Sequence, residues 1–270
     1  MNLGHQLQLH RAGFEAVAKF PRYQQTPIYI TEADPDGCAA CPASSIEGAQ
    51  YRTSTAYGAY ELAMMKRTLE LEAEVGIKLA GVLTWAFTFP DTPYFAGYRE
   101  LATNGINLPV MSAFELLGRL SGTRLPLSSS GAHELDDVLE NGVRAEPDID
   151  AMAALDGTDA RVLIWNFHDE IAPVAATPVH LAVALPTSFG ANVRVSHLRV
   201  DDSHGDAYLL WLSQGMPDSP SIEQVAALEQ AMKPSALVPD RTIALDEHRS
   251  ISLDFDLPRF GISLLTISGD

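Results

Sequence analysis

The feature that most constrains this chain is a change of pattern near residue 121. Before it, segments with apolar residues at helical spacing alternate with short apolar runs, which is typical of parallel strands joined by crossover helices. After it, short segments of alternating apolar and polar residues follow one another between turns, which favours an antiparallel β-sandwich. We therefore expect an α/β unit over residues 1–121 and an all-β unit over residues 122–270.

The α/β unit is expected to contain three helices and two strands. Apolar residues at helical spacing predict the helices, which cover 3–19, 55–75 and 107–122. In the third, Asn107 is expected at the N-cap and Pro109 in the first turn. The second is expected to turn Glu61 to solvent. Continuous apolar runs predict strands buried on both faces over 27–32 and 81–87.

The all-β unit is expected to contain five short strands. They cover 161–167, 180–185, 192–200, 250–257 and 261–267. One helix, over 221–232, interrupts them.

Composition and charge narrow the expected partners. Apolar residues make up 46% of the 270, and 35 acidic against 18 basic residues give a net charge of −17. A negative field repels nucleic acid and anionic lipid and suits a neutral ligand. No apolar run approaches the roughly 20 residues of a membrane helix. The stretch from Met1 to Arg11 has no secretory apolar segment, so a cytoplasmic location is expected if Met1 is the true start.

No motif predicts a metal or a cofactor. The only two cysteines, Cys38 and Cys41, lie in a Gly/Pro-rich loop, whereas zinc requires four ligands and a thioredoxin-like motif opens a helix. A pair that stiffens the loop, or two free thiols, remains. The eight histidines show no ligand spacing, and no P-loop or dinucleotide fingerprint is present.

The candidate chemistry lies where the predicted parallel strands end. Glu32 ends the first strand, at the edge where α/β barrels place their active sites. Trp85, Phe87 and Phe89 end the second, and flat aromatic faces in a cleft suit sugar rings. Alone, each has a structural alternative, since many strands end in an idle acid and large aromatics are usually buried. Asp34 and Asp36 are expected to form a turn.

Six stretches, in order and spread over the whole chain, resemble glycoside hydrolase family thirty-nine, the β-xylosidases and α-L-iduronidases. They are Ile30-Thr31-Glu32-Ala33-Asp34-Pro35-Asp36-Gly37, Leu83-Thr84-Trp85-Ala86-Phe87, Tyr94-Phe95-Ala96-Gly97-Tyr98, Val162-Leu163-Ile164-Trp165-Asn166-Phe167-His168-Asp169, Ala207-Tyr208-Leu209-Leu210-Trp211 and Phe255-Asp256-Leu257-Pro258-Arg259. The bacterial β-xylosidase branch is the nearest fit.

The resemblance implies a (β/α)₈ barrel followed by a β-sandwich. Glu32 matches the family's nucleophile, at the end of the seventh barrel strand. Trp85 matches the aromatic residue beside the reacting sugar, at the end of the eighth strand, and Phe87 and Tyr94 are expected to bind substrate with it. The implied activity is retaining removal of terminal xylose from xylo-oligosaccharides, without a cofactor.

One departure from the family is large. The family's acid/base is the Glu of an Asn-Glu-Pro segment, and this sequence contains no such segment. A barrel takes roughly 250 residues, whereas only about 121 precede the sandwich and they supply two clear strands. The chain is therefore expected to be the C-terminal part of such an enzyme, with little or no activity alone.

Two other functions remain open: another glycosidase of the family, such as an iduronidase, and a non-catalytic carbohydrate-binding or interaction protein. The incomplete barrel also has a physical consequence, because it exposes strand edges and an apolar face. We expect self-association or loose order in residues 1–121. Hydrogen exchange is expected to be fast at Ile28 to Thr31 and slow at Ile251 to Phe255.

Overall fold

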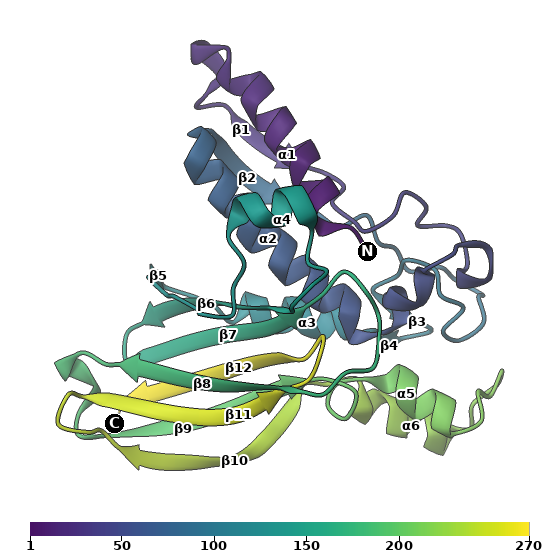
Figure 1. Ribbon diagram of the computed structural model, residues 1–270. Helices are drawn as coiled ribbons and strands as arrows, with labels where there is room; N and C mark the ends of the chain where they lie inside the picture. Colours follow the sequence, from purple (N-terminus) through teal and green to yellow (C-terminus); the bar gives the residue numbers. More distant parts are fainter. Residues whose placement is uncertain (270) are drawn as a thin grey trace.

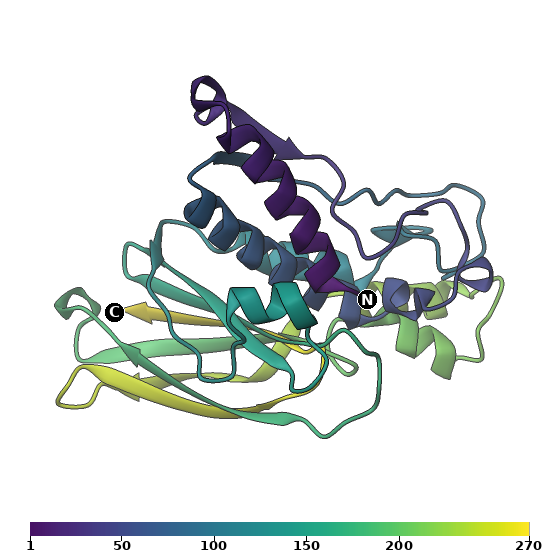
Figure 2. The same cartoon turned by 45° about the horizontal axis from the view of Figure 1, so that its top comes forward.

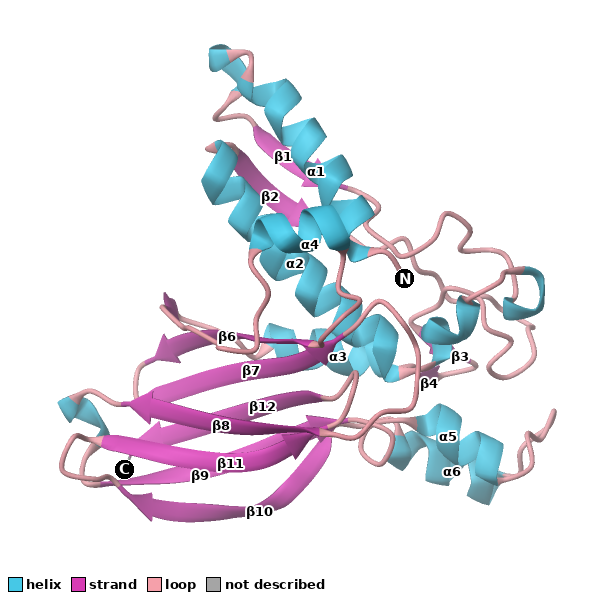
Figure 3. Ribbon diagram, in the orientation of Figure 1, coloured by secondary structure: helices cyan, strands magenta, loops and turns pink. Residues whose placement is uncertain are grey.

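The computed structural model describes residues 1–269 and contains an α/β part and an all-β part (Figure 1). Figure 3 shows the helices gathered above and to one side of the antiparallel strands. No helix within residues 1–269 is long and apolar enough to cross a membrane.

The α/β part begins with two helix–strand pairs. They are α1 Leu3–Ala18, β1 Pro27–Ile30, α2 Thr55–Val75 and β2 Lys78–Val82. Asn2 caps α1 and Ser54 caps α2, each by accepting a backbone N–H, and Gly76 in the left-handed conformation ends α2. β1 and β2 pair in parallel, so the predicted crossover arrangement is confirmed.

The predicted burial of β1 on both faces is wrong. Ile28 and Ile30 are half-buried against the helices, whereas Tyr29, on the other face, is 63% exposed. The reason is that the helices pack on one face of β1 and β2, and within residues 1–269 the Tyr29 face stays open to solvent. The predicted strand over 81–87 is also misplaced, since β2 ends at Val82 and the chain continues as a loop.

A two-strand hairpin and a third helix complete the α/β part: β3 Ala102–Thr103, β4 Ile106–Asn107 and α3 Pro109–Gly118. The expected N-cap at Asn107 is wrong, because Asn107 pairs in β4 and Leu108 takes the cap position without a side-chain hydrogen bond. Pro109 lies in the first turn as predicted. The helix ends at Gly118, before the predicted Gly122.

Glu61 was expected on the solvent face of α2, and this is wrong. Its side chain is fully buried. The first two turns of α2 are buried on all sides, because α2 packs against α1, α3 and the antiparallel sheet.

The all-β part has two antiparallel sheets. One has six strands in the order β10-β9-β12-β7-β6-β5, and the other pairs β11 with β8. Their bounds are β5 Thr123–Leu125, β6 Asp148–Asp156, β7 Asp159–Phe167, β8 Thr177–Ala184, β9 Asn192–Val200, β10 Ser235–Ala244, β11 Ser250–Leu257 and β12 Ile262–Gly269. The five predicted strands and the predicted helix, α6 Ile222–Ala231, are confirmed.

The inner strands β6, β7 and β12 of the six-stranded sheet are buried on both faces, whereas its edge strands β5 and β10 are mostly exposed. In β7, Val162 and Ile164 face the β8–β11 sheet, while Leu163 and Trp165 join the core under α2 and α3. The two helices that sequence reasoning missed, α4 Leu135–Asn141 and α5 Ala207–Ser213, lie beside α1 and α6 respectively (Figure 2). Of the helices, α2 and α3 pack directly on the six-stranded sheet. The division between 121 and 122 stays a proposal.

Candidate active site

Glu32 lies two residues beyond the end of β1, and its side chain reaches solvent. Its side chain is 46% exposed, and Arg99 Nη2 donates to its Oε1 at 2.9 Å. The backbone keeps the two strand ends together past β2, because Leu83 N–H donates to Ile30 O and Ala33 N–H donates to Leu83 O. Glu32 is thus a reachable carboxylate on a fixed backbone.

Arg99 connects the ends of both strands although it is fully buried. Its Nε donates to Trp85 O at 3.0 Å, and its Nη1 donates to the carbonyl and to Oδ1 of Asp36. Its Nη2 also lies 3.5 Å from Asp34 Oδ2. Burial alone lowers the pKa of Arg99, but the surrounding acids, Asp34 first, raise it above its ordinary value. A permanent cation therefore lies at the centre of three carboxylates.

Asp34 is buried and ties β1 to the loop after β2. It accepts hydrogen bonds from Tyr57 Oη at 2.7 Å, from Trp85 N at 2.8 Å and from the Thr84 hydroxyl. The expectation that Asp34 forms a turn is wrong, because all these partners are distant in sequence. Through Asp34, the first turn of α2 and the backbone of Trp85 are held beside Glu32.

Asp36 forms the predicted turn and also binds Arg52. Its Oδ1 accepts from Cys38 N at 2.9 Å, and its carboxylate receives Arg52 Nη2 at 2.7 Å and 2.8 Å. Burial raises the pKa of Asp36, but the hydrogen bonds from Tyr51 and Arg52 outweigh it and hold the pKa below its ordinary value.

Cys38 and Cys41 form a disulfide that closes the loop after Asp36. Arg52 fixes the same loop by donating to Cys38 O at 2.7 Å and Cys41 O at 2.6 Å. Its Nη1 also reaches Gly97 O at 3.1 Å. Gly97 has φ +76°, and a Cβ there would lie 2.3 Å from Ala43 Cβ, so only glycine fits this close approach. The cysteine pair stiffens the loop, which was one of its two predicted roles.

The aromatic residues separate into two groups. Trp85 and Phe87 are 47% and 43% exposed and meet edge to face, with Phe89 and Tyr98 continuing the row. Tyr94 contacts Phe95, which packs on Trp211 of α5. The structure therefore brings Trp85 and Phe87 into contact, with the Trp85 backbone bound to the arginine that holds Glu32, and places Tyr94 in the other group.

Two buried acids near this site were missed from sequence. Burial raises the pKa of Glu100 to about 7, and the Phe89 backbone offsets only part of this. Burial, and then the charge of Asp34, raises the pKa of Glu61 well above its ordinary value. Only their apolar sequence neighbours could have identified them: Arg99 and Glu100 interrupt an aromatic loop, and Glu61 interrupts an apolar helical segment.

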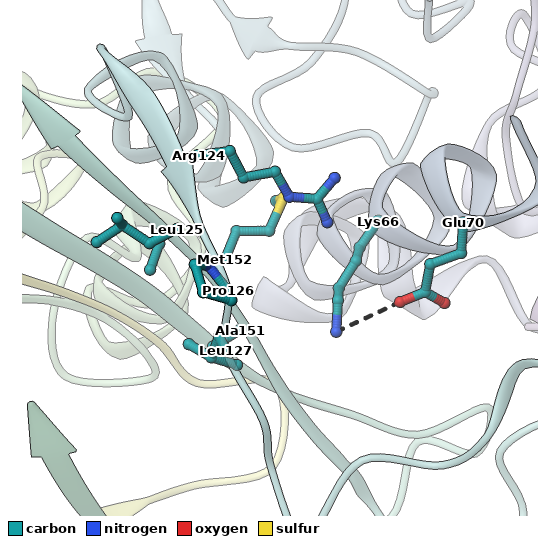
Figure 4. A pocket seen from close by; sticks show the side chains of 9 residues that line it. Lys66, Glu70, Arg124, Leu125, Pro126, Leu127, Ala151 and Met152 are labelled. Atoms are coloured by element: carbon teal, nitrogen blue, oxygen red, sulfur yellow. Dashed lines mark ion pairs between the residues drawn. The ribbon is translucent and has the colours of Figure 1, made fainter. Parts of the chain in front are cut away.

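A surface pocket lies elsewhere. It has a volume of about 410 Å³ between α2 and strands β5 and β6, where Lys66 pairs with Glu70 (Figure 4). Lys66 also forms an ion pair with the buried Asp150 of β6. The charged groups at this pocket are therefore paired with one another and need no ligand. Glu32 and Trp85 do not line it. No group of three or more metal-binding side chains occurs within residues 1–269.

The model of the glycosyl hydrolases family 39 matches residues 8–246. The chain belongs to this family. No curated protein matches it significantly. Among solved structures, a family 39 enzyme from Xanthomonas axonopodis pv. citri has 20% identity and a TM-score of 0.62, over 81% of this chain and 42% of its own.

Two further structures share the fold. A monomeric β-xylosidase from Caulobacter crescentus has 16% identity and a TM-score of 0.66, over 90% of this chain and 45% of its own. A bacterial orthologue of human α-L-iduronidase has 18% identity and a TM-score of 0.73, over 96% of this chain and 45% of its own. The chain thus spans less than half of each relative, which fits a partial barrel followed by antiparallel sheets.

Proposed function

We propose that this chain carries the nucleophile half of a retaining glycosidase site, with Glu32 as the nucleophile and terminal β-xylose as the sugar. The observation that carries the proposal is Glu32 itself, a solvent-reachable carboxylate at the end of a parallel strand, held by a buried arginine. Active sites of α/β barrels lie at this edge. Trp85, whose backbone carbonyl accepts from the same arginine, and Phe87 are half-exposed aromatic residues of the loop after the neighbouring strand.

In the proposed reaction, Glu32 Oε attacks the anomeric carbon while the bond to the leaving oxygen breaks with its electron pair. A second carboxyl, about 5–5.5 Å away, protonates that oxygen and then removes a proton from the water that releases the sugar. The sequence contains no Asn-Glu-Pro segment to supply it. We assign this second group to a portion of the enzyme outside residues 1–270, and expect low activity from the chain alone on substrates that require protonation.

Charge around Glu32 favours a neutral sugar over a uronide. The two arginines of the surrounding loops, Arg52 and Arg99, are fully buried, and their guanidinium groups are occupied by Asp36 and neighbouring carbonyl groups. A substrate carboxylate would need a free cation, and these two offer no unoccupied face. An iduronide stays the second candidate, because the iduronidase orthologue shares the fold over 96% of this chain.

The test uses a substrate that does not need the missing acid. A 2,4-dinitrophenyl 2-deoxy-2-fluoro-β-xyloside has a leaving group that departs as the phenolate, so Glu32 can be glycosylated without a proton donor. Peptide mass spectrometry is expected to find the fluoroxylosyl ester on Glu32. Glu47, an exposed carboxylate of the same loop, serves as the matched control, and Glu47→Gln should label normally.

Three results would count against the proposal. An unlabelled wild-type chain, or a label on another residue, contradicts the role of Glu32. Faster labelling by the corresponding fluorinated uronide contradicts the choice of xylose and supports the second candidate.

A further inference from the structure

We propose that Arg99 is a positioning residue for Glu32: it fixes one carboxylate oxygen and leaves the other to attack. This inference rests on the proposed function and adds a residue to it. Arg99 lies in the loop after β2, 67 residues from Glu32 in sequence, and its guanidinium group is fully buried beneath an exposed carboxylate.

The contacts of Arg99 fix its plane before it meets Glu32. Nε is held by Trp85 O and Nη1 by Asp36, which belong to the two strand ends that flank the site. The remaining nitrogen, Nη2, then points to Glu32 Oε1. The Trp85 carbonyl and the carbonyl and carboxylate of Asp36 together determine the orientation of the planar guanidinium group. Its direction toward Glu32 is therefore set by the fold and not by the substrate.

Glu32 needs such a support. Its side chain is 46% exposed, so an unrestrained carboxylate would sample several rotamers in water. Within residues 1–269, the Arg99 bond is the one side-chain hydrogen bond that Glu32 makes, and Oε2 has no partner. A carboxylate held at one oxygen presents the other in a fixed direction, which is what attack on a single carbon requires.

Arg52 is the natural control for this role. It is equally buried, and it binds the same Asp36, but it reaches Cys38 and Cys41 and does not touch Glu32. Loss of the arginine fork at either position should loosen the loops. Only the loss at Arg99 should misdirect Glu32.

The first experiment compares Arg99→Lys with Arg52→Lys in the full chain, by the rate and the concentration dependence of fluoroxyloside labelling. Lysine keeps the charge but loses the planar fork. We expect Arg99→Lys to slow the maximal labelling rate about 10- to 100-fold and to change the half-saturating concentration less than about twofold, because Arg99 directs the attack without binding the sugar. Arg52→Lys should lower the melting temperature at least as much and keep the maximal rate within about threefold.

The second experiment does not require catalysis. The Arg99 side-chain N–H signals of ¹⁵N-labelled protein should shift on Glu32→Gln and stay in place on Glu47→Gln. Unchanged Arg99 signals in the Glu32→Gln variant would overturn the positioning contact, even if the wild type is labelled.

The two failures are distinguishable. An unlabelled wild type refutes the proposed function, and the N–H signals then decide whether Arg99 holds Glu32. A labelled wild type whose rate falls equally in Arg99→Lys and Arg52→Lys refutes the positioning role alone, because both arginines would then serve only loop stability.

Discussion

The parallel pair β1–β2 and the six-stranded antiparallel sheet are built from similar apolar residues but differ in what covers them. Trp165 in β7 is fully buried between helices and strands, whereas Tyr29 in β1 is 63% exposed. Each inner strand of the large sheet has neighbours on both sides, while β1 and β2 have only each other within residues 1–269. Among the strands, burial is thus deepest in β6, β7 and β12, and the candidate chemistry lies at the ends of β1 and β2, which contain no fully buried residue.

Buried charges beside the strand ends keep the candidate site rigid. A two-stranded sheet is marginal by itself. The ends of β1 and β2 are instead held by buried charge: Arg99 and Asp34 bind both loops, and Arg52 and Asp36 hold the disulfide loop. These side-chain hydrogen bonds hold the two strand ends together next to Glu32.

The largest expected effect is chemical and confined to the parallel region. Glu32→Gln should reduce release of dinitrophenolate from a xyloside by about a thousandfold or more, since the amide cannot act as a nucleophile. The melting temperature should change little, because the side chain is 46% exposed. Initial rates and a melting curve check both. A variant that keeps a tenth of the wild-type rate would contradict the assignment.

A pair of tryptophans compares the two regions with the same residue type. Trp165→Ala should destabilise the chain by about 3–5 kcal/mol, the usual loss for a fully buried aromatic. Trp85→Ala should cost less than about 1 kcal/mol, since Trp85 is 47% exposed, but should slow reaction with small aryl glycosides about tenfold or more. Denaturant unfolding and kinetics measure these changes. A large stability loss with normal kinetics in Trp85→Ala would show a core role.

The third expected effect depends on pH. Burial raises the pKa of Glu100 to about 7, above its ordinary 4.5. The stability linked to its proton is complete below pH 4.5 and is lost as the pH rises through about 7. Glu100→Gln should therefore be about 3 kcal/mol more stable than wild type at pH 8 and equal to it at pH 4. Urea melts at both values test this, with Glu47→Gln as an exposed control. A difference in stability between Glu100→Gln and wild type that appears at pH 4 and not at pH 8 would contradict the raised pKa of Glu100.

Sequence patterns predicted the helices and strands whose apolar spacing matches the way they are buried in the fold. The helix over 55–75 and the strand over 192–200 have the predicted bounds. β6 was missed because Ala and Asp dominate it, and its two buried acids, Asp148 and Asp150, are paired with Arg67 and Lys66 of α2. β10 was missed because Pro239 interrupts it, which an edge strand tolerates.

The candidate site was predictable only in part for a related reason. The position of Glu32 follows from a local pattern, a strand that ends on an acid before a turn. The role of Arg99 does not, because its partners Glu32 and Asp36 lie 67 and 63 residues away. Long-range contacts of buried charges leave no periodic trace in a sequence.

Hydrogen exchange of the intact chain tests the central claim most directly, namely that the chemistry lies in the less covered region. We predict fast exchange at Ile28 to Thr31 and slow exchange at Ile251 to Phe255 and in β7 and β12, the latter two paired on both sides. The parallel region should also self-associate through its free edges as concentration rises. Equal, strong protection of both regions in a monomer would contradict the account.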